Sequence, residues 1–144
     1  MRNILAALFF SSLMVIAMPS DSDEKLEYIE YELKKCIDNN SFSSFLFETK
    51  NKESRHFTIN TDEMIVEFSF SGGKGSVKWN SIKKITYLKL DNNRGYLKFL
   101  FIGKQMFYPF KKLESIEFGV IDINCWDFLV SRVDSQVHTD IINR

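Results

Sequence analysis

The stretch GYLKFLFIGKQMFYPF, Gly95 to Phe110, decides the fold that this sequence predicts. Aromatic side chains recur along it, and alternate residues of an extended strand share one face, which gathers Leu97, Phe99 and Phe101. The Gly103-Lys104 pair interrupts the alternation near the middle of the stretch. We therefore expect two strands here, 96–102 and 105–110, joined by a tight turn.

Period-two alternation continues toward the N-terminus and predicts further antiparallel strands. In the segment MIVEFSF (64–70), it places Val66, Phe68 and Phe70 on the core side. The fold class that we predict is α+β, mainly β, with seven antiparallel strands in a bent sheet or barrel. The expected strands cover residues 42–49, 56–60, 64–70, 76–79, 83–90, 96–102 and 105–110.

Two amphipathic helices flank the predicted strands. Apolar residues at three- and four-residue spacing predict an N-terminal helix over 22–38. The same spacing predicts a C-terminal capping helix over about Asn124 to Asp134, with Trp126 on its buried face. The segment KKLESIEFGVIDI (111–123) is less regular, and we expect the polar tail 135–144 to fray.

The N-terminus MRNILAALFFSSLMVIAMPS has the layout of an export signal. Arg2 precedes an uncharged, mostly apolar run from Ile4 to Ile16, and small residues suit cleavage after Ala17, with Ser20 as a second choice. We therefore expect residues 1–17 to be a signal peptide and the protein to be exported, periplasmic or secreted. The alternative is a retained signal anchor, although the apolar run is short for a membrane span.

Composition fits a single domain over residues 21–134. The chain is 44% hydrophobic and 26% charged, which is close to the average of globular domains. Its 19 basic and 19 acidic residues balance, so no overall field attracts nucleic acid. We expect no nucleic-acid partner, and contact with a membrane only through a local surface patch rather than a span.

Cys36 and Cys125 lie far apart in the sequence, without a CxxC pair or a nearby histidine cluster. In an oxidising compartment they predict one disulfide, and two buried free thiols that act as small hydrophobes are the alternative. The same spacing argues against a zinc site, so we expect no metal and no cofactor.

Signatures of catalysis are missing from the sequence. It holds two histidines, His56 and His138, and no HExxH, GxSxG or phosphate-binding glycine loop. We therefore expect no catalytic residues and no enzyme. A hydrolase whose residues come together only in the fold is the alternative.

One loop offers candidate ligand-binding residues. The segment ETKNKESRHF joins the first two expected strands and carries Lys50, Lys52 and Arg55, and Lys74 in the glycine-rich turn SGGKG can join them. These cations would bind an anionic lipid or glycan through charge-assisted hydrogen bonds. Because two glutamates dilute the charge, a solvated loop without a ligand is the competing interpretation.

The order of the elements resembles that of the pleckstrin-homology-like superfamily, including its bacterial members. The pattern KWNSIKKITYLKL, GYLKFLFI, QMFYPF and then a helix with Trp126 carries the resemblance, which covers Phe42 to Asp134 and includes Trp79. It implies a bent seven-stranded barrel closed at one end by the C-terminal helix. The N-terminal helix departs from that core fold, and most such domains work inside cells.

Together these features favour an exported, non-catalytic binding module for a protein or peptide partner. Barrels of this kind can accept a peptide as an added strand at an open sheet corner. Two alternatives stay open. One is a periplasmic inhibitor or immunity-type protein that blocks a toxin or hydrolase, and the other is anionic lipid or glycan binding through the first hairpin loop.

Overall fold

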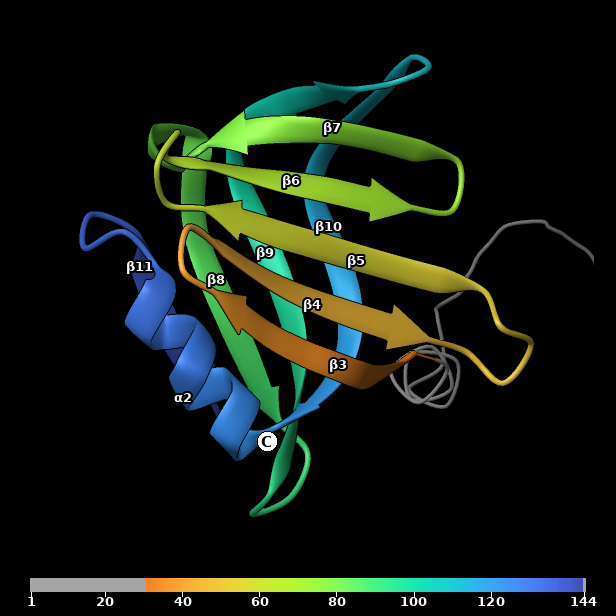
Figure 1. Cartoon of the computed structure of the whole chain (residues 1–144), viewed down its shortest axis with the longest axis vertical. Helices are drawn as coiled ribbons and strands as arrows, with labels where there is room; N and C mark the ends of the chain where they lie inside the picture. Colours follow the sequence, from red (N-terminus) through yellow and green to blue (C-terminus); the bar gives the residue numbers. More distant parts are fainter. Residues whose placement is uncertain (1–30, 144) are drawn as a thin grey trace, which may run out of the picture.

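The computed structural model describes residues 31–143, which form one sheet and one α-helix (Figure 1). The expected signal peptide, residues 1–17, and its cleavage site lie outside the described residues. The elements in chain order are β3 (Glu32–Asn39), β4 (Phe42–Glu48), β5 (Ser54–Asn60), β6 (Ile65–Phe70), β7 (Gly73–Lys78), the 3₁₀ turn η2 (Trp79–Ser81), β8 (Ile82–Lys89), β9 (Arg94–Phe107), β10 (Lys111–Asp122), α2 (Ile123–Arg132) and β11 (His138–Ile142).

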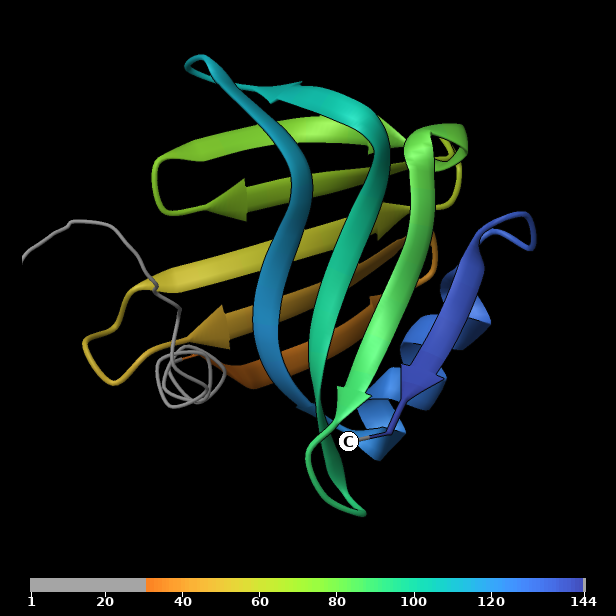
Figure 2. The ribbon, with the colours of Figure 1, turned by 180° about the vertical axis from the view of Figure 1, so that it is seen from behind.

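The described strands form a nine-stranded mixed sheet in the order β11-β8-β9-β10-β3-β4-β5-β6-β7. The sheet bends into two layers, with β3 to β7 crossing in front of β8 to β10 (Figures 1 and 2). Neighbouring strands pair antiparallel within β3 to β7 and within β8 to β10, whereas β10–β3 and β11–β8 pair parallel. The core lies between the two layers.

This architecture corrects the fold class expected from the sequence. The prediction of seven antiparallel strands with a helix at each end is wrong, because the described residues contain nine strands in a mixed sheet and a single helix. The mainly β content agrees with the prediction. The additional strands are β3, β10 and β11, and the two strands expected at 96–102 and 105–110 are one.

Residues 32–38, expected as the end of a helix over 22–38, belong to strand β3. The register against β4 shifts between Leu33 and Lys35, so that Leu33 faces Phe47 and Cys36 faces Phe45. This bulge places two residues three positions apart on the same side of a strand, which imitates helical spacing. The earlier part of the expected helix lies outside the described residues.

Strand β9 continues through Gly103, where the sequence predicts a turn between 96–102 and 105–110. Gly103 has a φ of +70°, which a glycine adopts without strain, so the strand bends there instead of ending. The chain reverses at 108–110 and enters β10. The irregular look of β10 in the sequence comes from register shifts, one of them at Glu117–Gly119, which interrupt the alternation.

The C-terminal tail does not fray as expected for 135–144. Residues His138–Ile142 form β11, which pairs in parallel with β8 along its whole length. Lys84 Nζ and Asp140 Oδ2 lie 3.9 Å apart across this pairing. The edge of β8 provides the backbone hydrogen-bonding partners that the five residues of β11 would lack on their own.

Aromatic rings fill the core. Phe57 of β5 is fully buried at its centre, with ring centroids of its neighbours 4.6 Å away at Phe45, 4.7 Å at Phe118 and 4.9 Å at Phe99. These partners come from both layers, so this one ring joins them. The predicted inward face of β6 is confirmed, since Val66 and Phe68 are buried and Phe70 is partly buried against the core.

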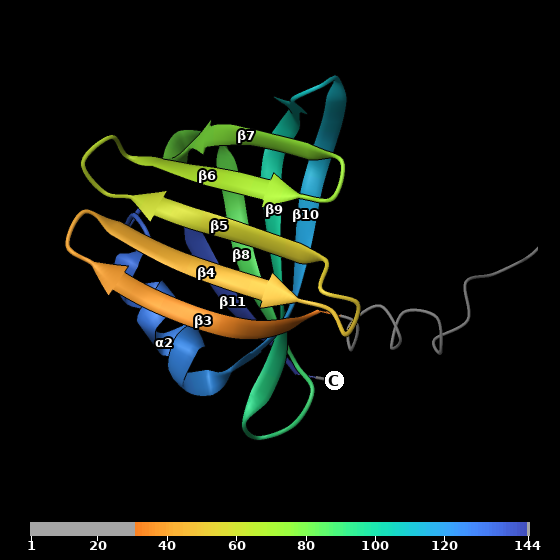
Figure 3. The same ribbon diagram turned by 45° about the vertical axis from the view of Figure 1, so that its right-hand side comes forward.

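The expected C-terminal helix is confirmed as α2, and it lies at the end of the molecule away from β7 (Figure 3). Asp122 caps it, because its carboxylate accepts a hydrogen bond of 2.8 Å from the backbone N–H of Cys125. Trp126 is buried, and its ring stacks on Tyr87 of β8 at a centroid distance of 5.0 Å. The helix therefore closes one end of the core.

Beside β3 the backbones of the two layers approach each other closely, at a place that we call the Tyr31–Gly119 seam. The backbone N–H of Val120 donates a hydrogen bond of 2.9 Å to the carbonyl oxygen of Tyr31. Gly119 has a φ of +127°, and a Cβ there would lie 2.4 Å from that oxygen. Only glycine fits this close approach of two backbones.

Candidate functional site

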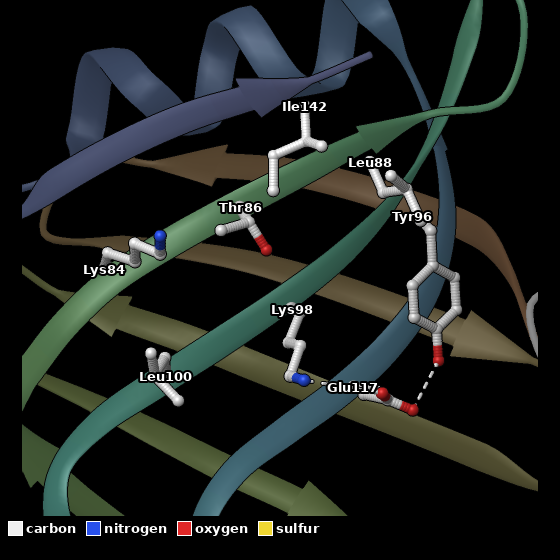
Figure 4. Close-up of a pocket in the computed structure, with 8 residues that line it drawn as sticks. All are labelled: Lys84, Thr86, Leu88, Tyr96, Lys98, Leu100, Glu117 and Ile142. Atoms are coloured by element: carbon white, nitrogen blue, oxygen red, sulfur yellow. Dashed lines mark hydrogen bonds and ion pairs between the residues drawn. The ribbon is translucent and has the colours of Figure 1, made fainter. Parts of the chain in front are cut away.

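A shallow groove of about 290 Å³ lies on the outer face of β8, β9 and β10, beside β11 (Figure 4). Alternation along the strands places these side chains away from the core. The groove has both apolar and charged walls. Its lining residues are Lys84, Thr86, Leu88, Tyr96, Lys98, Leu100, Glu117 and Ile142.

The charged wall of the groove is already paired. Lys98 and Glu117 face each other across β9 and β10, with Nζ and Oε2 3.8 Å apart. The Tyr96 hydroxyl donates a hydrogen bond of 3.2 Å to Oε1 of the same carboxylate (Figure 4). Each oxygen of the Glu117 carboxylate therefore has a partner inside the groove.

The apolar wall of the groove leads to the edge of the sheet. Leu88 of β8 and Ile142 of β11 are partners in register, and Leu100 of β9 lies farther along the groove. Strand β11 is the terminal strand of the described sheet. Its outer edge therefore offers backbone N–H and C=O groups to which another strand can pair.

Exposed isoleucines stand on both faces of that edge. Ile142 shares the groove face with Leu88, while the neighbouring Ile141 points to the opposite face, as its partner Tyr87 does. They are 40% and 48% exposed, respectively. An added strand would cover apolar surface on both faces at once.

A second, more open depression lies over β5, β6 and β7. His56, Glu67 and Lys74 reach it from neighbouring strands, and Tyr108 closes one side. Lys74 and Tyr108 exchange two backbone hydrogen bonds of 2.8 and 3.1 Å, which tie β7 to the β9–β10 hairpin. This bond pair covers part of the edge of β7, so the second depression is less suited to strand addition than β11.

The four basic residues predicted as a ligand site have different surroundings. Lys50 and Lys52 are exposed in the turn between β4 and β5. Arg55 instead belongs to the seam: its guanidinium lies 4.2 Å from the centroid of the Tyr31 ring and donates a hydrogen bond to the carbonyl oxygen of Glu117. Arg55 therefore has a structural task that the sequence did not reveal.

Lys74 is also separate from the β4–β5 turn. It lies on β7, paired with Ser69 of β6 on one side and bridged to Tyr108 on the other. No contact joins it to Lys50 or Lys52 in the described residues. The anion site expected from these residues stays a prediction.

Cys36 and Cys125 are free thiols, and their sulfur atoms are not at bonding distance, which differs from the expected disulfide. The structure does bring them together, since the two side chains interact between β3 and α2. Burial raises the pKa of the Cys125 thiol to about 12, and contact with Cys36 and Asp122 adds to the shift. Burial also raises the pKa of Cys36, against the lowering effect of its hydrogen bond with Cys125. Both groups are therefore protonated near neutral pH.

Sequence reasoning missed the residues that define the groove. Glu117 lies in the segment that seemed irregular, and Ile142 lies in the tail expected to fray. The outward positions of β9, which include Tyr96 and Leu100, were the one indication of the groove in the sequence. Apolar residues on the outer face of a strand indicate that something packs against that face.

The described residues offer few other sites. Within 31–143, no group of three or more His, Cys, Asp or Glu side chains is placed to hold a metal ion. In the same part of the chain, no helix has both the length and the apolar character needed to cross a membrane.

Comparisons with known proteins identify no relative. No protein-family model matches the chain, and neither the curated proteins nor the solved structures contain a significant match. The resemblance to pleckstrin-homology-like domains therefore remains a prediction from the sequence.

Proposed function

We propose that this protein is an exported, non-catalytic binding module that takes up an extended segment of a partner protein as a new strand beside β11. The observation that carries the proposal is the open edge of β11, with an apolar groove on one face and an exposed isoleucine on each face. Backbone hydrogen bonds would supply affinity, and alternate side chains would supply specificity.

The edge also suggests what the segment looks like. On the groove face it would lie beside Asp140 and Ile142, and on the opposite face beside Ile141, following the register of β11 with β8. Cross-strand neighbours of this kind contribute about 0.2–1 kcal/mol each. A segment with apolar residues on both faces and a basic residue near Asp140 fits best.

The site chemistry supports binding over catalysis. Glu117, the acid of the groove, is held by Lys98 and Tyr96, and Lys84 is paired with Asp140. These groups can fix a ligand's orientation through charge and hydrogen bonds. If the partner proves to be a toxin or hydrolase, the module would act as its inhibitor.

A pair of matched variants tests the proposal. Peptides that bind the full chain would be selected from a random display library, and their affinities measured by fluorescence anisotropy. We expect Ile141→Lys to weaken binding at least about tenfold, because a lysine at a strand edge opposes strand addition. Ile37→Lys is the control, because Ile37 of β3 is equally exposed, at 48%.

Hydrogen exchange separates strand addition from other modes of binding. Amides of β11 that face outward should exchange more slowly when the peptide is bound. A protein captured from the envelope fraction of the host should compete with the peptide for the same edge. Peptide binding that Ile141→Lys leaves unchanged, or the absence of any edge-binding peptide, would overturn the proposal.

A further inference from the structure

The tip of the β9–β10 hairpin carries the most exposed large apolar side chains of the described residues. Phe110 is 90% exposed and Tyr108 is 70% exposed, and Ile102 and Met106 are each more than half exposed. All four lie within eleven consecutive positions, 102–112. Apolar side chains clustered in this way on a solvent-facing hairpin indicate a surface that contacts something.

The tip is held in place from inside. Phe107, between Met106 and Tyr108, is fully buried, and its ring centroid lies 5.5 Å from that of Phe70 and 5.8 Å from that of Phe101. The two backbone hydrogen bonds between Tyr108 and Lys74 fix the base of the tip on β7. Phe107 therefore anchors the hairpin in the core, and the side chains of its neighbours Met106 and Tyr108 lie outside it.

Positive charge surrounds these apolar side chains. Residues 102–112 include Lys104, Lys111 and Lys112 and contain no Asp or Glu, and Lys74 adds a fourth cation at the base. The whole chain, in contrast, has a formal net charge of zero. The basic character is thus local to the tip, and the acidic residue that follows along the chain is Glu114.

We infer that this hairpin tip docks on the surface of an anionic lipid bilayer. Phe110 would enter the boundary of the acyl chains, and Tyr108, with an apolar ring and a polar hydroxyl, suits the headgroup level. The lysines would lie among anionic headgroups, to which each cation near the surface adds attraction. Glu67 lies near Lys74 in the depression beside Tyr108, but the segment 102–112 itself carries three lysines and no acid. That segment is therefore complementary to the anionic surface in both polarity and charge.

The docked tip leaves the proposed peptide edge free. Figures 1 and 2 place the β9–β10 turn at the end of the molecule away from α2 and β11. A bilayer at one end and a partner strand at the other can therefore be bound together. The inference does not depend on the function proposed for β11.

Fluorescence of a tryptophan placed at the tip tests the inference in the full chain. Phe110→Trp would be mixed with vesicles of phosphatidylcholine and phosphatidylglycerol, some of them carrying brominated acyl chains. We expect a blue shift of the added emission and quenching by bromine, because the indole leaves water. Phe42→Trp is the control, since Phe42 is an exposed phenylalanine on β4, outside the tip.

Charge variants test the electrostatic part. We expect Lys104→Gln with Lys112→Gln to weaken binding to the anionic vesicles at least about tenfold, and added salt to do the same to the wild type. Lys50→Gln with Lys52→Gln removes equal charge from the β4–β5 turn and should leave binding within about twofold. Anionic vesicles also report whether that turn is a lipid site.

The outcomes separate cleanly. Equal quenching of tryptophans at positions 110 and 42, or none at 110, would overturn the inference. Loss of binding in the Lys50 and Lys52 variant alone would assign lipid contact to the other loop and overturn it as well. A protein that binds the tip while vesicles do not would make the tip a protein interface instead.

Discussion

Replacing Phe57 by alanine tests whether one ring joins the two layers of the sheet. Its three nearest neighbours, Phe45, Phe99 and Phe118, have ring centroids within 5 Å and lie on β4, β9 and β10. Truncation removes these contacts and leaves a cavity that the crossing layers cannot fill. Truncating a fully buried phenylalanine to alanine lowers the free energy of unfolding by about 3–5 kcal/mol. Against a total stability of about 5–15 kcal/mol, this is a large fraction.

Urea unfolding measures the loss, and the buried indoles of Trp79 and Trp126 report it by fluorescence. With a denaturant slope of about 2 kcal/mol per molar urea, the midpoint should fall by about 1.5–2.5 M. Phe57→Leu keeps most of the volume and should cost less than about 1.5 kcal/mol, so it remains measurable if the alanine variant does not fold. Phe42→Ala, at an exposed position, should cost less than about 1 kcal/mol. A loss below about 1 kcal/mol for Phe57→Ala, or equal losses at positions 57 and 42, would refute the central role of this ring.

Three further predictions concern the seam, the thiols and Tyr87. Gly119→Ala should destabilise by at least about 1–3 kcal/mol in urea, because strained backbone adds to the clash with Tyr31; an unchanged midpoint would contradict the seam. Cys36 and Cys125 should react slowly with iodoacetamide at pH 8, as followed by mass spectrometry, and faster as pH rises, since their raised pKa values leave little thiolate. Burial, with a smaller contribution from Asp122, raises the pKa of Tyr87 from 10.0 to about 12. As pH rises, the unfolded chain therefore loses this proton before the folded protein does. The stability from this group should be complete below pH 10 and should be lost by about pH 12, whereas Tyr87→Phe should remove this part of the pH dependence.

Alternating segments without bulges could be predicted from sequence. β4 and β6 lie within a residue or two of their expected positions, and α2 follows its apolar spacing around Trp126. β8 was also placed within a residue, because its one register shift lies at its start, between Ile82 and Lys84. The errors concentrate where register shifts. Leu33 and Cys36 share a face of β3 only because a bulge lies between them, and the shift at Glu117–Gly119 hides the alternation of β10.

The candidate site was less accessible to sequence reasoning than the fold. Its groove depends on β10 and β11, and β11 is a strand only because the edge of β8 is there to receive it. The local sequence of residues 138–142 gives no indication that this segment pairs with a distant strand. The contact between Cys36 and Cys125 was expected, although the sequence placed Cys36 on a helix and the structure places it on strand β3. The separate role of Arg55 could not be predicted, because it depends on where Tyr31 lies in the fold.

The order of strands bears on how the chain reaches this fold. Most neighbours in the sheet are consecutive in the chain, so their hairpins close short loops at little entropic cost. The β10–β3 and β11–β8 pairings and the Lys74–Tyr108 bridge join segments that are more distant in sequence. We expect the two runs of hairpins to form early and independently. The slowest folding step should then be the meeting of the two halves, at the Tyr31–Gly119 seam and at the Lys74–Tyr108 bridge.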